Sequence, residues 1–474
     1  MNTLVWFRSD LRTRDNTALH AAACANHGCL IGVFILCPQQ WKDHHWGGPR
    51  VDFLLRNLRA LGAELKRLNI PLKIVRSNRF DGVPQALLKL ARAHDCAALY
   101  CNSEHEVNEV RRDDEVRAAF ETDNRQMHTF RDQTILDVAD IRTQAGGWYS
   151  VFTPFKRKWC ELFKSGDELK EFAPPQPQSS SKVPADEVPT QLAGFSTDAD
   201  CKLWPEGESS AHQRLASFVD QAIADYATRR DEPATDGTSA LSPYLACGVL
   251  SPRQCLRAAL AVNHNRVDSG KKGVATWISE LIWREFYRHI LIGFPRVCMD
   301  RPFRTETERL RWNNDTVQFE AWCAGATGFP IVDAGMRQLA AAGWMHNRVR
   351  MIVAMFLTKD LFIDWRWGER FFMEHLVDGD FASNNGGWQW SASTGTDAAP
   401  YFRVFNPARQ SERYDPNGAY IRRWVPELEP VPANRIHDPD AATRGERDYP
   451  APIVDRSKSR ARVVEAFKRL GGSR

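Results

Sequence analysis

The chain has 474 residues, 63 basic and 59 acidic side chains, a net charge of +4 and 43% hydrophobic residues. The length predicts two or three domains rather than one core, and the small net charge excludes a generic polyanion binder, so any nucleic-acid surface must be a local patch. Eleven cysteines without a Cys-x-x-Cys pair indicate neither a disulfide framework nor a zinc site, and we expect no metal.

The beginning of the chain indicates where the protein works. Residues 1–12 become charged too early for a signal peptide, and no apolar run approaches the length of a membrane span. We therefore expect a cytoplasmic protein with reduced cysteines and no membrane contact.

Short β-rich runs alternate with amphipathic stretches up to Arg131. This pattern predicts an α/β doubly wound parallel-sheet domain over residues 1–131, with helices on both faces. The expected strands cover residues 4–7, 30–36, 72–75, 97–100 and 127–130. The expected helices cover residues 51–68, 83–94 and 107–120. The dinucleotide-binding motif Gly-x-Gly-x-x-Gly does not follow the first strand. Any ligand of this domain must therefore be bound by other residues. Ligands of such sheets sit beyond the carboxyl ends of strands, which here carry Trp41, His44 and His45 and residues 102–109.

Residues 132–210 form a connector. It contains a basic and aromatic run at 152–159 and a Pro- and Ser-rich stretch at 173–182 that is typical of a surface linker. Periodicity near 3.6 dominates after about residue 211 and predicts a mostly α-helical second domain over 211–474.

The segment 378–400 combines carboxylates, amides, paired glycines and two tryptophans, which favours the grip on a polar, aromatic cofactor. A turn-rich loop is the alternative. Ten of the 16 tryptophans fall in the last two-fifths of the chain, more than a core needs.

Residues 236–243 place a turn, the hydroxyls of Thr238 and Ser239 and a capping Ser242 before a helical stretch. Such a helix start can bind phosphate oxygens, or it can be a plain helix cap.

Two further helical runs carry polar and aromatic faces. In 277–289, Trp277, Glu280 and Arg284 share one face, and a buried Glu280–Arg284 ion pair is the alternative to a binding role. In 343–351, one face combines Trp344, Asn347 and Met351 with Arg348 and Arg350 beside it, or the run is core plus solvated charge.

These residues resemble a known family. Over nearly its whole length the chain is similar to the DNA photolyase and cryptochrome family, and most to bacterial class I cyclobutane pyrimidine dimer photolyases. The resemblance rests on the motifs at 4–12, 237–239, 283–287, 343–348 and 378–397. It implies an antenna domain, a helical domain that holds FAD, and repair in which light-excited reduced FAD gives an electron to a flipped-out thymine dimer.

The resemblance also implies residue roles. The FAD contacts would be Tyr226, Thr238, Ser239, Leu241, Ser242, Trp277, Glu280, Arg284, Asn347, Arg350, Asp378, Asp380 and Asn384, with Asn384 at flavin N5. Glu280 and Asn347 would hydrogen-bond the pyrimidines, Trp283 and Trp390 would stack on the flipped bases, and Met351 would pack against them. The phosphate contacts would be Arg230, Arg348 and Arg403.

Trp388, Trp365 and Trp312 match the family's electron-hopping chain, with core packing as the alternative for the last two. His45, Asn108, Glu109 and Cys298 match positions that bind 5,10-methenyltetrahydrofolate. Met299 stands where related enzymes carry a lysine, and Ala240 replaces a larger polar residue. The first departure weakens the folate assignment, so a deazaflavin antenna or an empty pocket stays open.

The expected partner is DNA containing cyclobutane pyrimidine dimers. We expect a monomer with no obligate protein partner, associated with the bacterial nucleoid through DNA. A blue-light signalling receptor is the main alternative, and repair of (6-4) photoproducts is a weaker one. Asn384, Trp283, Trp390 and Met351 favour dimer repair, because the (6-4) branch usually places histidines around the lesion.

Overall fold

The computed structural model describes residues 1–25, 28–163 and 169–471. Its amino-terminal part is a parallel sheet in the order β3-β2-β1-β4-β5. The strands are β1 Asn2–Phe7, β2 Leu30–Leu36, β3 Leu72–Arg76, β4 Cys96–Asn102 and β5 Gln126–Phe130. Every predicted strand is confirmed with ends shifted by two residues or fewer.

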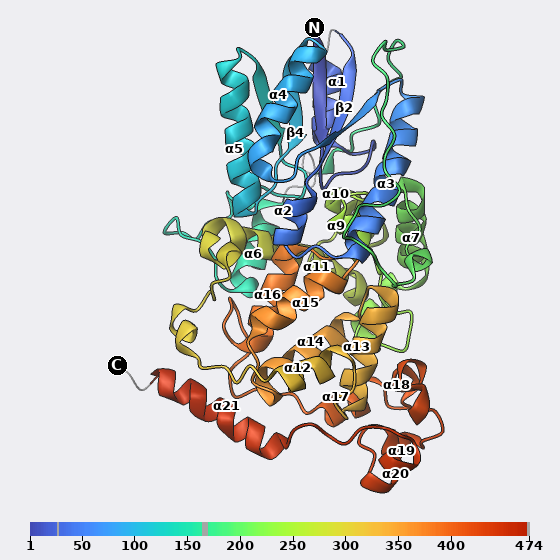
Figure 1. Cartoon of the computed structure of the whole chain (residues 1–474), viewed down its shortest axis with the longest axis vertical. Coiled ribbons are helices and arrows are strands. Elements are labelled where there is room, and N and C mark those ends of the chain that lie inside the picture. Colours follow the sequence, from blue (N-terminus) through green and yellow to red (C-terminus); the bar gives the residue numbers. More distant parts are fainter. Residues whose placement is uncertain (26–27, 164–168, 472–474) are drawn as a thin grey trace.

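Helices cover both faces of this sheet. They are α1 Thr17–Ala25, α2 Pro38–Asp43, α3 Gly48–Arg67, α4 Val83–Ala93 and α5 Val107–Thr122, with the short 3-10 helix η1 Phe80–Gly82 before α4. Right-handed crossovers place α1 and α3 on one face and α4 and α5 on the other, and α4 and α5 lie together in front of the strands in Figure 1. The predicted doubly wound domain is therefore confirmed.

The connector is more ordered than a free linker. It contains α6 Phe152–Leu162, and its Pro- and Ser-rich part continues along the edge strand β3. There Asp186 N donates to Leu72 O (2.8 Å) and Asp186 Oδ2 accepts from Ile74 N (2.9 Å). The segment thus covers one edge of the sheet and satisfies its backbone groups.

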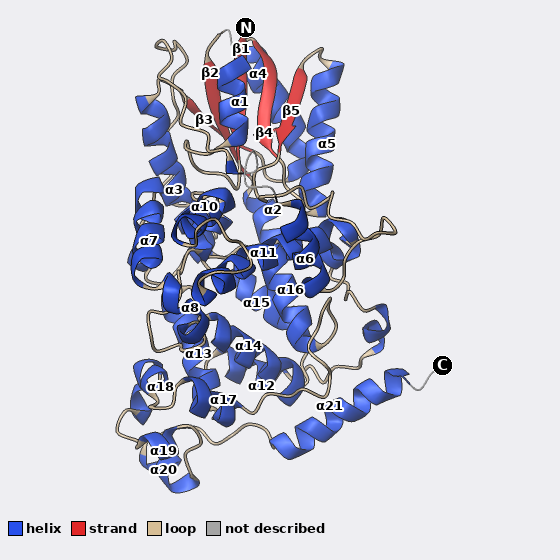
Figure 2. Ribbon diagram, turned by 180° about the vertical axis from the view of Figure 1, so that it is seen from behind, coloured by secondary structure: helices blue, strands red, loops and turns tan. Residues whose placement is uncertain are grey.

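The rest of the described chain is helical, as predicted, and Figure 2 shows the strands confined to one end of the molecule. Its longer helices are α7 Glu208–Gln221, α10 Pro252–Val262, α11 Lys272–Gly293, α12 Thr316–Cys323, α13 Pro330–Ala342, α14 Asn347–Met355, α15 Trp365–His375, α16 Phe381–Ala392, α17 Pro407–Tyr414 and α21 Arg456–Gly471. Shorter ones are α8 Tyr226–Arg229, α9 Ser242–Ala246, α18 Ala419–Trp424, α19 Ala433–Ile436 and α20 Ala441–Glu446. The 3-10 helices are η3 Cys201–Leu203, η4 Ile223–Asp225, η5 Pro295–Met299, η6 Thr305–Arg309 and η8 Pro426–Leu428, and a π-helix, η7 Phe356–Asp360, extends α14.

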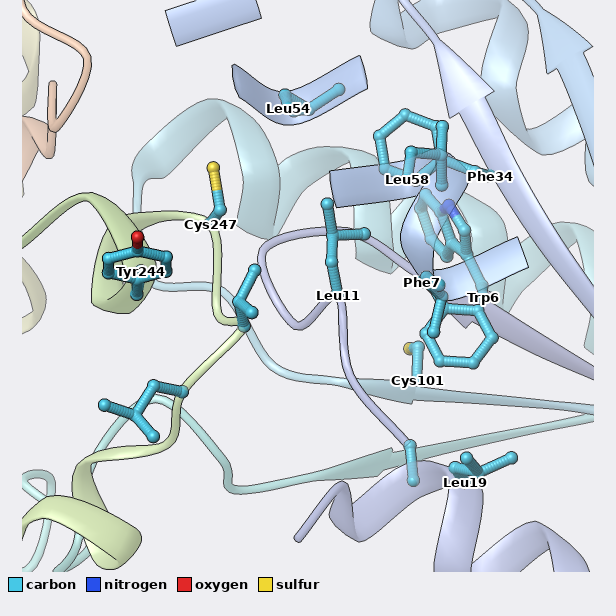
Figure 3. Close-up of a cluster of buried hydrophobic side chains, with 14 of the residues drawn as sticks. Trp6, Phe7, Leu11, Leu19, Phe34, Leu54, Leu58, Cys101, Tyr244 and Cys247 are labelled. Atoms are coloured by element: carbon cyan, nitrogen blue, oxygen red, sulfur yellow. The ribbon is translucent and has the colours of Figure 1, made fainter. Parts of the chain in front are cut away.

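One hydrophobic core joins the two halves. The Tyr244 ring of α9 lies 5.5 Å from the Phe53 ring of α3, and Figure 3 shows Tyr244 and Cys247 beside Leu11 and the core of the sheet domain. Two buried charge pairs cross the same boundary, Arg253 Nη2–Asp132 Oδ1 (2.9 Å) and Arg253 Nε–Asp15 Oδ2 (3.1 Å). Asp132 also pairs with Arg12 of the amino-terminal half (2.6 Å). Within the part of the chain that is described, no helix is long and apolar enough to cross a membrane.

Candidate functional site

The helical half encloses a cavity of about 360 Å³ between α9, α11, α14 and α16. Its wall draws on segments far apart in the sequence. Of the residues predicted from the sequence, it contains Tyr226, Ser239, Leu241, Ser242, Trp277, Glu280, Trp283, Arg284, Asn347, Arg350, Met351, Asp378, Asp380, Asn384 and Trp388. The structure thus brings most of the predicted cofactor residues into one space, together with two of the predicted DNA contacts.

Helix α11 supplies one wall, since residues at three- and four-residue spacing share a face. The Oε1 atom of Glu280 accepts a hydrogen bond from Arg230 Nη1 (2.6 Å), whereas Arg284 donates to the backbone oxygen of Gln133. The Glu280–Arg284 ion pair considered from the sequence is therefore wrong. Burial raises the pKa of Glu280, and the nearby Arg230 opposes the rise. Burial and the neighbouring Arg288 lower the pKa of Arg284 to about 10.

Helix α16 forms the opposite wall, so the turn-rich loop considered for 378–400 is wrong for most of that segment. Asp380 caps the helix by accepting from Ser383 N (2.9 Å). A Cβ on Gly386 would lie 2.2 Å from the Tyr287 ring of α11, so this glycine permits the close approach of the two helices. A Cβ on Gly387 would meet no heavy atom within 4 Å, because this glycine faces the cavity.

Each of the two aspartates at the cavity edge has an arginine partner. Asp378 pairs with Arg350 (2.9 Å) and Asp380 with Arg288 (2.6 Å). Burial would raise the pKa of Asp380, but Arg288 and Arg284 outweigh burial and hold that pKa well below its ordinary value. The carboxylate of Asp380 is therefore ionised across the neutral range.

The amide of Asn384 is held in one orientation. Its Nδ2 donates to the backbone oxygen of Glu369 (3.0 Å), and its Oδ1 accepts no hydrogen bond from any residue that the structure describes. Asn384 therefore presents a free acceptor at the cavity.

The segment before α9 differs from the prediction. Ser242 is the first residue of this five-residue helix rather than its cap, and the capping position is Leu241, without a side-chain hydrogen bond. Thr238 lies in the preceding turn, outside the cavity lining. Trp344 is also displaced: α14 begins only at Asn347, so Trp344 lies before the helix, and its Nε1 donates to Ser242 Oγ (3.3 Å).

The predicted DNA contacts divide into two groups. Trp283 and Met351 line the cavity, while the half-buried Trp390 and the exposed Arg403 lie outside its lining. Arg348 pairs with Asp231 (2.8 Å), a partner that sequence reasoning missed.

A second missed residue lies against Trp283. The ring of Phe152 stacks on the Trp283 ring at a centroid distance of 3.7 Å and 9°. Phe152 belongs to the basic and aromatic run of the connector, but no sequence pattern links it to a residue 131 positions away. One face of Trp283 is therefore occupied by the protein.

Of the three tryptophans predicted to act as a chain, two are fully buried and one is half-buried. Trp388 and Trp365 are 2% and 1% exposed and belong to one buried cluster, and the half-buried Trp312 packs against that cluster. Trp388 alone of the three lines the cavity. The ring of Trp322, which the sequence did not single out, lies 6.0 Å from the Trp388 ring.

A second cavity of about 270 Å³ lies between the two halves. His45, Asn108, Glu109 and Cys298 all line it, and it shares Arg284 and Asp380 with the first cavity. Two further carboxylates line this cavity, Glu106 and Glu369. Glu106 belongs to the stretch 102–109 that was expected near a ligand, but neither residue was assigned a role from the sequence.

In the second cavity, the neighbouring carboxyl groups of Glu106 and Glu109 lie close to each other. Burial and the neighbouring Glu106 raise the pKa of Glu109 to about 8. Burial lowers the pKa of His44 to about 4. His44 Nδ1 and Glu109 Oε1 are 3.4 Å apart, so at neutral pH this contact joins two uncharged groups.

A third, smaller space of about 50 Å³ lies at the carboxyl ends of β1 and β2. Side chains narrow this space: the stacked rings of Trp41 and Trp46 lie 5.1 Å apart, and the guanidinium of Arg50 lies 3.5 Å from the Trp46 ring. Little room is left at this position of the sheet.

A doubly wound domain joined to a helical domain with an enclosed polar and aromatic cavity defines a two-domain cofactor-binding protein. Residues 3–178 match the family described as DNA photolyase, and residues 277–469 match the FAD binding domain of DNA photolyase. The chain is 42% identical to the deoxyribodipyrimidine photo-lyase of Vibrio cholerae, over 99% of this chain and 100% of that protein. It belongs to the DNA photolyase family.

Solved structures agree with this placement. A bacterial class III photolyase from Agrobacterium tumefaciens superposes with a TM-score of 0.89 at 34% identity, covering 100% of this chain and 98% of that one. A cryptochrome from Synechocystis sp. PCC6803 gives a TM-score of 0.85 at 28% identity, over 98% and 99% of the two chains.

The cavity of the helical half fits the FAD that this family's domain binds. The side-chain-free wall at Gly387 leaves room against a flat ring, and Asn384 offers a free acceptor. Arg350, Arg284 and the two aspartates supply groups for a polar ring edge and for ribose and phosphate oxygens.

Proposed function

We propose that this protein is a light-dependent DNA repair lyase that splits cyclobutane pyrimidine dimers into monomers. The observation that carries the proposal is the single cavity in which Trp283, Glu280 and Met351 lie beside the residues suited to FAD. The full-length relative from Vibrio cholerae, named deoxyribodipyrimidine photo-lyase, supports it.

Bound FAD, reduced and excited by light, supplies the electron for splitting. The residues that would hold its diphosphate side are Tyr226, Thr238, Ser239, Leu241 and Ser242, and those along its rings Trp277, Glu280, Arg284, Asn347, Arg350, Asp378, Asp380 and Asn384. Thr238 would contribute through the turn before α9, since it does not line the cavity. Asn384 would accept a hydrogen bond from the ring edge with its free Oδ1.

The DNA lesion must leave the duplex to reach this cavity, at a cost of about a few kcal/mol. Phe152 covers one face of Trp283, so a flipped base would stack on the other. Stacking at roughly 1–3 kcal/mol per base can offset the cost, and Trp390 would add a second ring from outside the cavity lining.

The polar groups near Trp283 would stabilise charge on the pyrimidines. Burial raises the pKa of Glu280 and Arg230 opposes the rise; Glu280 would hydrogen-bond the pyrimidine edge, where negative charge develops. Its present partner Arg230 would then be free for a phosphate. Asn347 would hydrogen-bond the same edge, and Met351 would pack against the bases.

Arg230, Arg348 and Arg403 are the proposed phosphate contacts. They would provide a local basic patch on a chain of small net charge once DNA displaces the carboxylates that now pair with Arg230 and Arg348, and such contacts to phosphates are positional rather than base-specific. We propose a monomer in the cytoplasm, associated with the nucleoid through DNA and without an obligate protein partner.

Trp388, Trp365 and Trp312 form the proposed path by which electrons reach the cofactor from the surface. Trp388 lines the cavity, Trp365 is buried beside the same cluster and Trp312 reaches the half-buried rim. The contact of Trp388 with the cavity and the partial exposure of Trp312 support an electron path between the two.

The proposed antenna is 5,10-methenyltetrahydrofolate in the cavity between the halves, held by His45, Asn108, Glu109 and Cys298. A deazaflavin is the alternative. The division into an antenna domain at 1–131, a connector at 132–210 and an FAD domain at 211–474 is part of the same proposal.

One assay tests the repair function. The purified protein is incubated with dimer-containing DNA under blue light and in darkness, and intact dimers are counted. We expect loss of dimers only under light. Equal results in light and darkness contradict the proposal and favour a signalling role like that of a cryptochrome.

A further inference from the structure

A cavity of about 600 Å³ lies apart from the two cavities described above, between the segment 309–313 and the last helix, α21. Figure 1 shows α21 at the end of the molecule opposite the sheet. The cavity is lined by Arg309, Leu310, Arg311, Trp312, Asn313, Phe362, Arg462, Glu465, Ala466, Arg469 and Leu470. None of these residues lines either of the other two cavities.

The lining is strongly positive. It holds four arginines and one glutamate, and that glutamate, Glu465, already pairs with Arg469. In the part of the chain that is described, Arg311 has no ion-pair partner within 4 Å, and Arg309 donates to the backbone oxygen of Leu470 (3.5 Å) and lies near Glu306, whose pKa it helps to lower. Unpaired guanidinium groups around a concave surface attract anions.

One of these arginines has an unused hydrogen-bond donor. Arg462 Nη2 donates to the backbone oxygen of Asp360 (2.9 Å), but its Nε is buried and has no partner. Burial also lowers the pKa of Arg462.

The cavity also has an aromatic wall. Trp312 is half-buried there, with its ring 5.0 Å from the ring of Phe362. An indole beside guanidinium groups suits a ligand that carries a flat ring and a phosphate, since the ring stacks while the phosphate pairs with arginine.

We propose that this cavity binds a phosphate-bearing, planar one-electron donor of the reduced flavin mononucleotide class and delivers its electron to Trp312. The proposal rests on the proposed function, in which Trp312 is the outer end of the electron path. The anionic dihydroflavin gives one electron to the oxidised indole of Trp312. The indole returns to its neutral form, and the donor leaves as its neutral one-electron-oxidised radical, so charge and electrons balance without a proton transfer.

Binding is measured in the dark with the FAD-loaded protein and free flavin mononucleotide, whose fluorescence a stacked indole quenches. We expect saturable quenching by the native protein that inorganic phosphate reverses. Arg311→Gln should bind at least tenfold more weakly, whereas Arg409→Gln, an exposed arginine of α17, should bind as the native protein does. Riboflavin, which lacks the phosphate, should also bind at least tenfold more weakly. Absent quenching, equal binding of riboflavin, or unchanged binding by Arg311→Gln overturns the proposal.

Electron delivery is measured separately by flash absorption under anaerobic conditions. After a flash on the protein with oxidised FAD, the oxidised indole signal should decay at least tenfold faster with reduced flavin mononucleotide in the native protein than in Arg311→Gln. Neutral dithiothreitol should give equal decay in both proteins. Equal decay of the two proteins with the reduced nucleotide contradicts the delivery step. If the native protein forms no indole signal, the electron path of the proposed function fails, and with it the delivery step, while the dark titration still decides binding.

Discussion

The cavity inside the helical half and the cavity between the two halves differ in how their charges are balanced. In the first, Asp378 pairs with Arg350 and Glu280 with Arg230, and the Asp380–Arg288 pair borders both cavities. In the second, Glu106 and Glu109 lie close together, and burial and mutual repulsion raise the pKa of Glu109 to about 8.

This difference separates two kinds of binding site. Paired charges keep their state over a wide pH range, which suits a cofactor that must stay bound and oriented. Carboxyl groups that titrate near neutral pH change the second cavity within the working range of most proteins. We therefore expect the first cavity to resist changes of pH and the second to respond to them.

The largest effect is expected for Asp380, which lines both cavities. Asp380→Asn leaves the buried Arg288 without its ionised partner, and we expect a loss of about 3–5 kcal/mol in the free energy of unfolding, measured by urea titration. Because the pKa of Asp380 lies below its ordinary value in the folded protein, this stability is present above about pH 4. It is lost as pH falls further, so native and variant proteins should converge there.

A matched control for this variant is Asp440→Asn. Asp440 also caps a helix, accepting from Thr443 N (2.8 Å), but it is exposed and pairs with the exposed Arg435. Its replacement should cost far less than that of Asp380, because the pair is exposed to solvent and Asn is also a good capping residue. Similar losses for both variants would mean that capping, and not the buried pair, accounts for the effect of Asp380.

The second effect concerns the glycine that faces the first cavity. Gly387→Leu places a side chain where the FAD ring is proposed to lie, and overpacking of roughly 1–3 kcal/mol should lower the FAD content of the purified protein about tenfold to a hundredfold. Absorbance after gel filtration measures that content. Gly445→Leu is the control, because a Cβ there also meets no heavy atom within 4 Å but lies outside the cavity. Native FAD content in Gly387→Leu would place the cofactor elsewhere.

The sequence predicted much of this arrangement because much of it is local. Helical spacing placed Trp277, Glu280 and Arg284 on one face of α11, and apolar runs located the strands within two residues. The partners of these residues were not predictable in the same way. Arg230, which pairs with Glu280, comes from a segment 50 residues earlier, and only the packing of α8 against α11 brings the two together.

The starting residues of helices were also hard to predict from the sequence. The run 343–351 has apolar periodicity from Trp344, but the helix begins three residues later. There His346 accepts from Arg348 N (3.2 Å) and caps it. Histidine is not among the preferred capping residues, so no sequence signal marked this boundary, and Trp344 was placed on the wrong side of it.

The third effect belongs to the first cavity alone. Trp283→Ala removes the ring that Phe152 holds from one side, and binding of dimer-containing DNA should weaken by roughly 1–3 kcal/mol through lost base stacking. A gel-shift titration in darkness measures this. Phe152→Leu should cause a smaller loss, because the indole remains but loses its support. FAD content should be native in both variants, and unchanged binding by Trp283→Ala would remove this residue from the lesion site.

The smallest effect tests the second cavity. Since the pKa of Glu109 is about 8, its carboxyl keeps a proton at neutral pH and ionises as pH rises, next to Glu106 and with Arg112 opposing. The amount of added methenyltetrahydrofolate that the protein retains at pH 7 should therefore fall severalfold by pH 9, because the carboxylates of the folate are repelled by the newly ionised Glu109.

Glu109→Gln, which stays neutral, should hold the folate equally at both pH values. Glu374→Gln, at an exposed carboxylate beside His45, should titrate as the native protein does. FAD content should stay constant throughout. If Glu109→Gln loses folate with pH as the native protein does, another group controls this cavity, and the contrast between the two sites does not rest on Glu109.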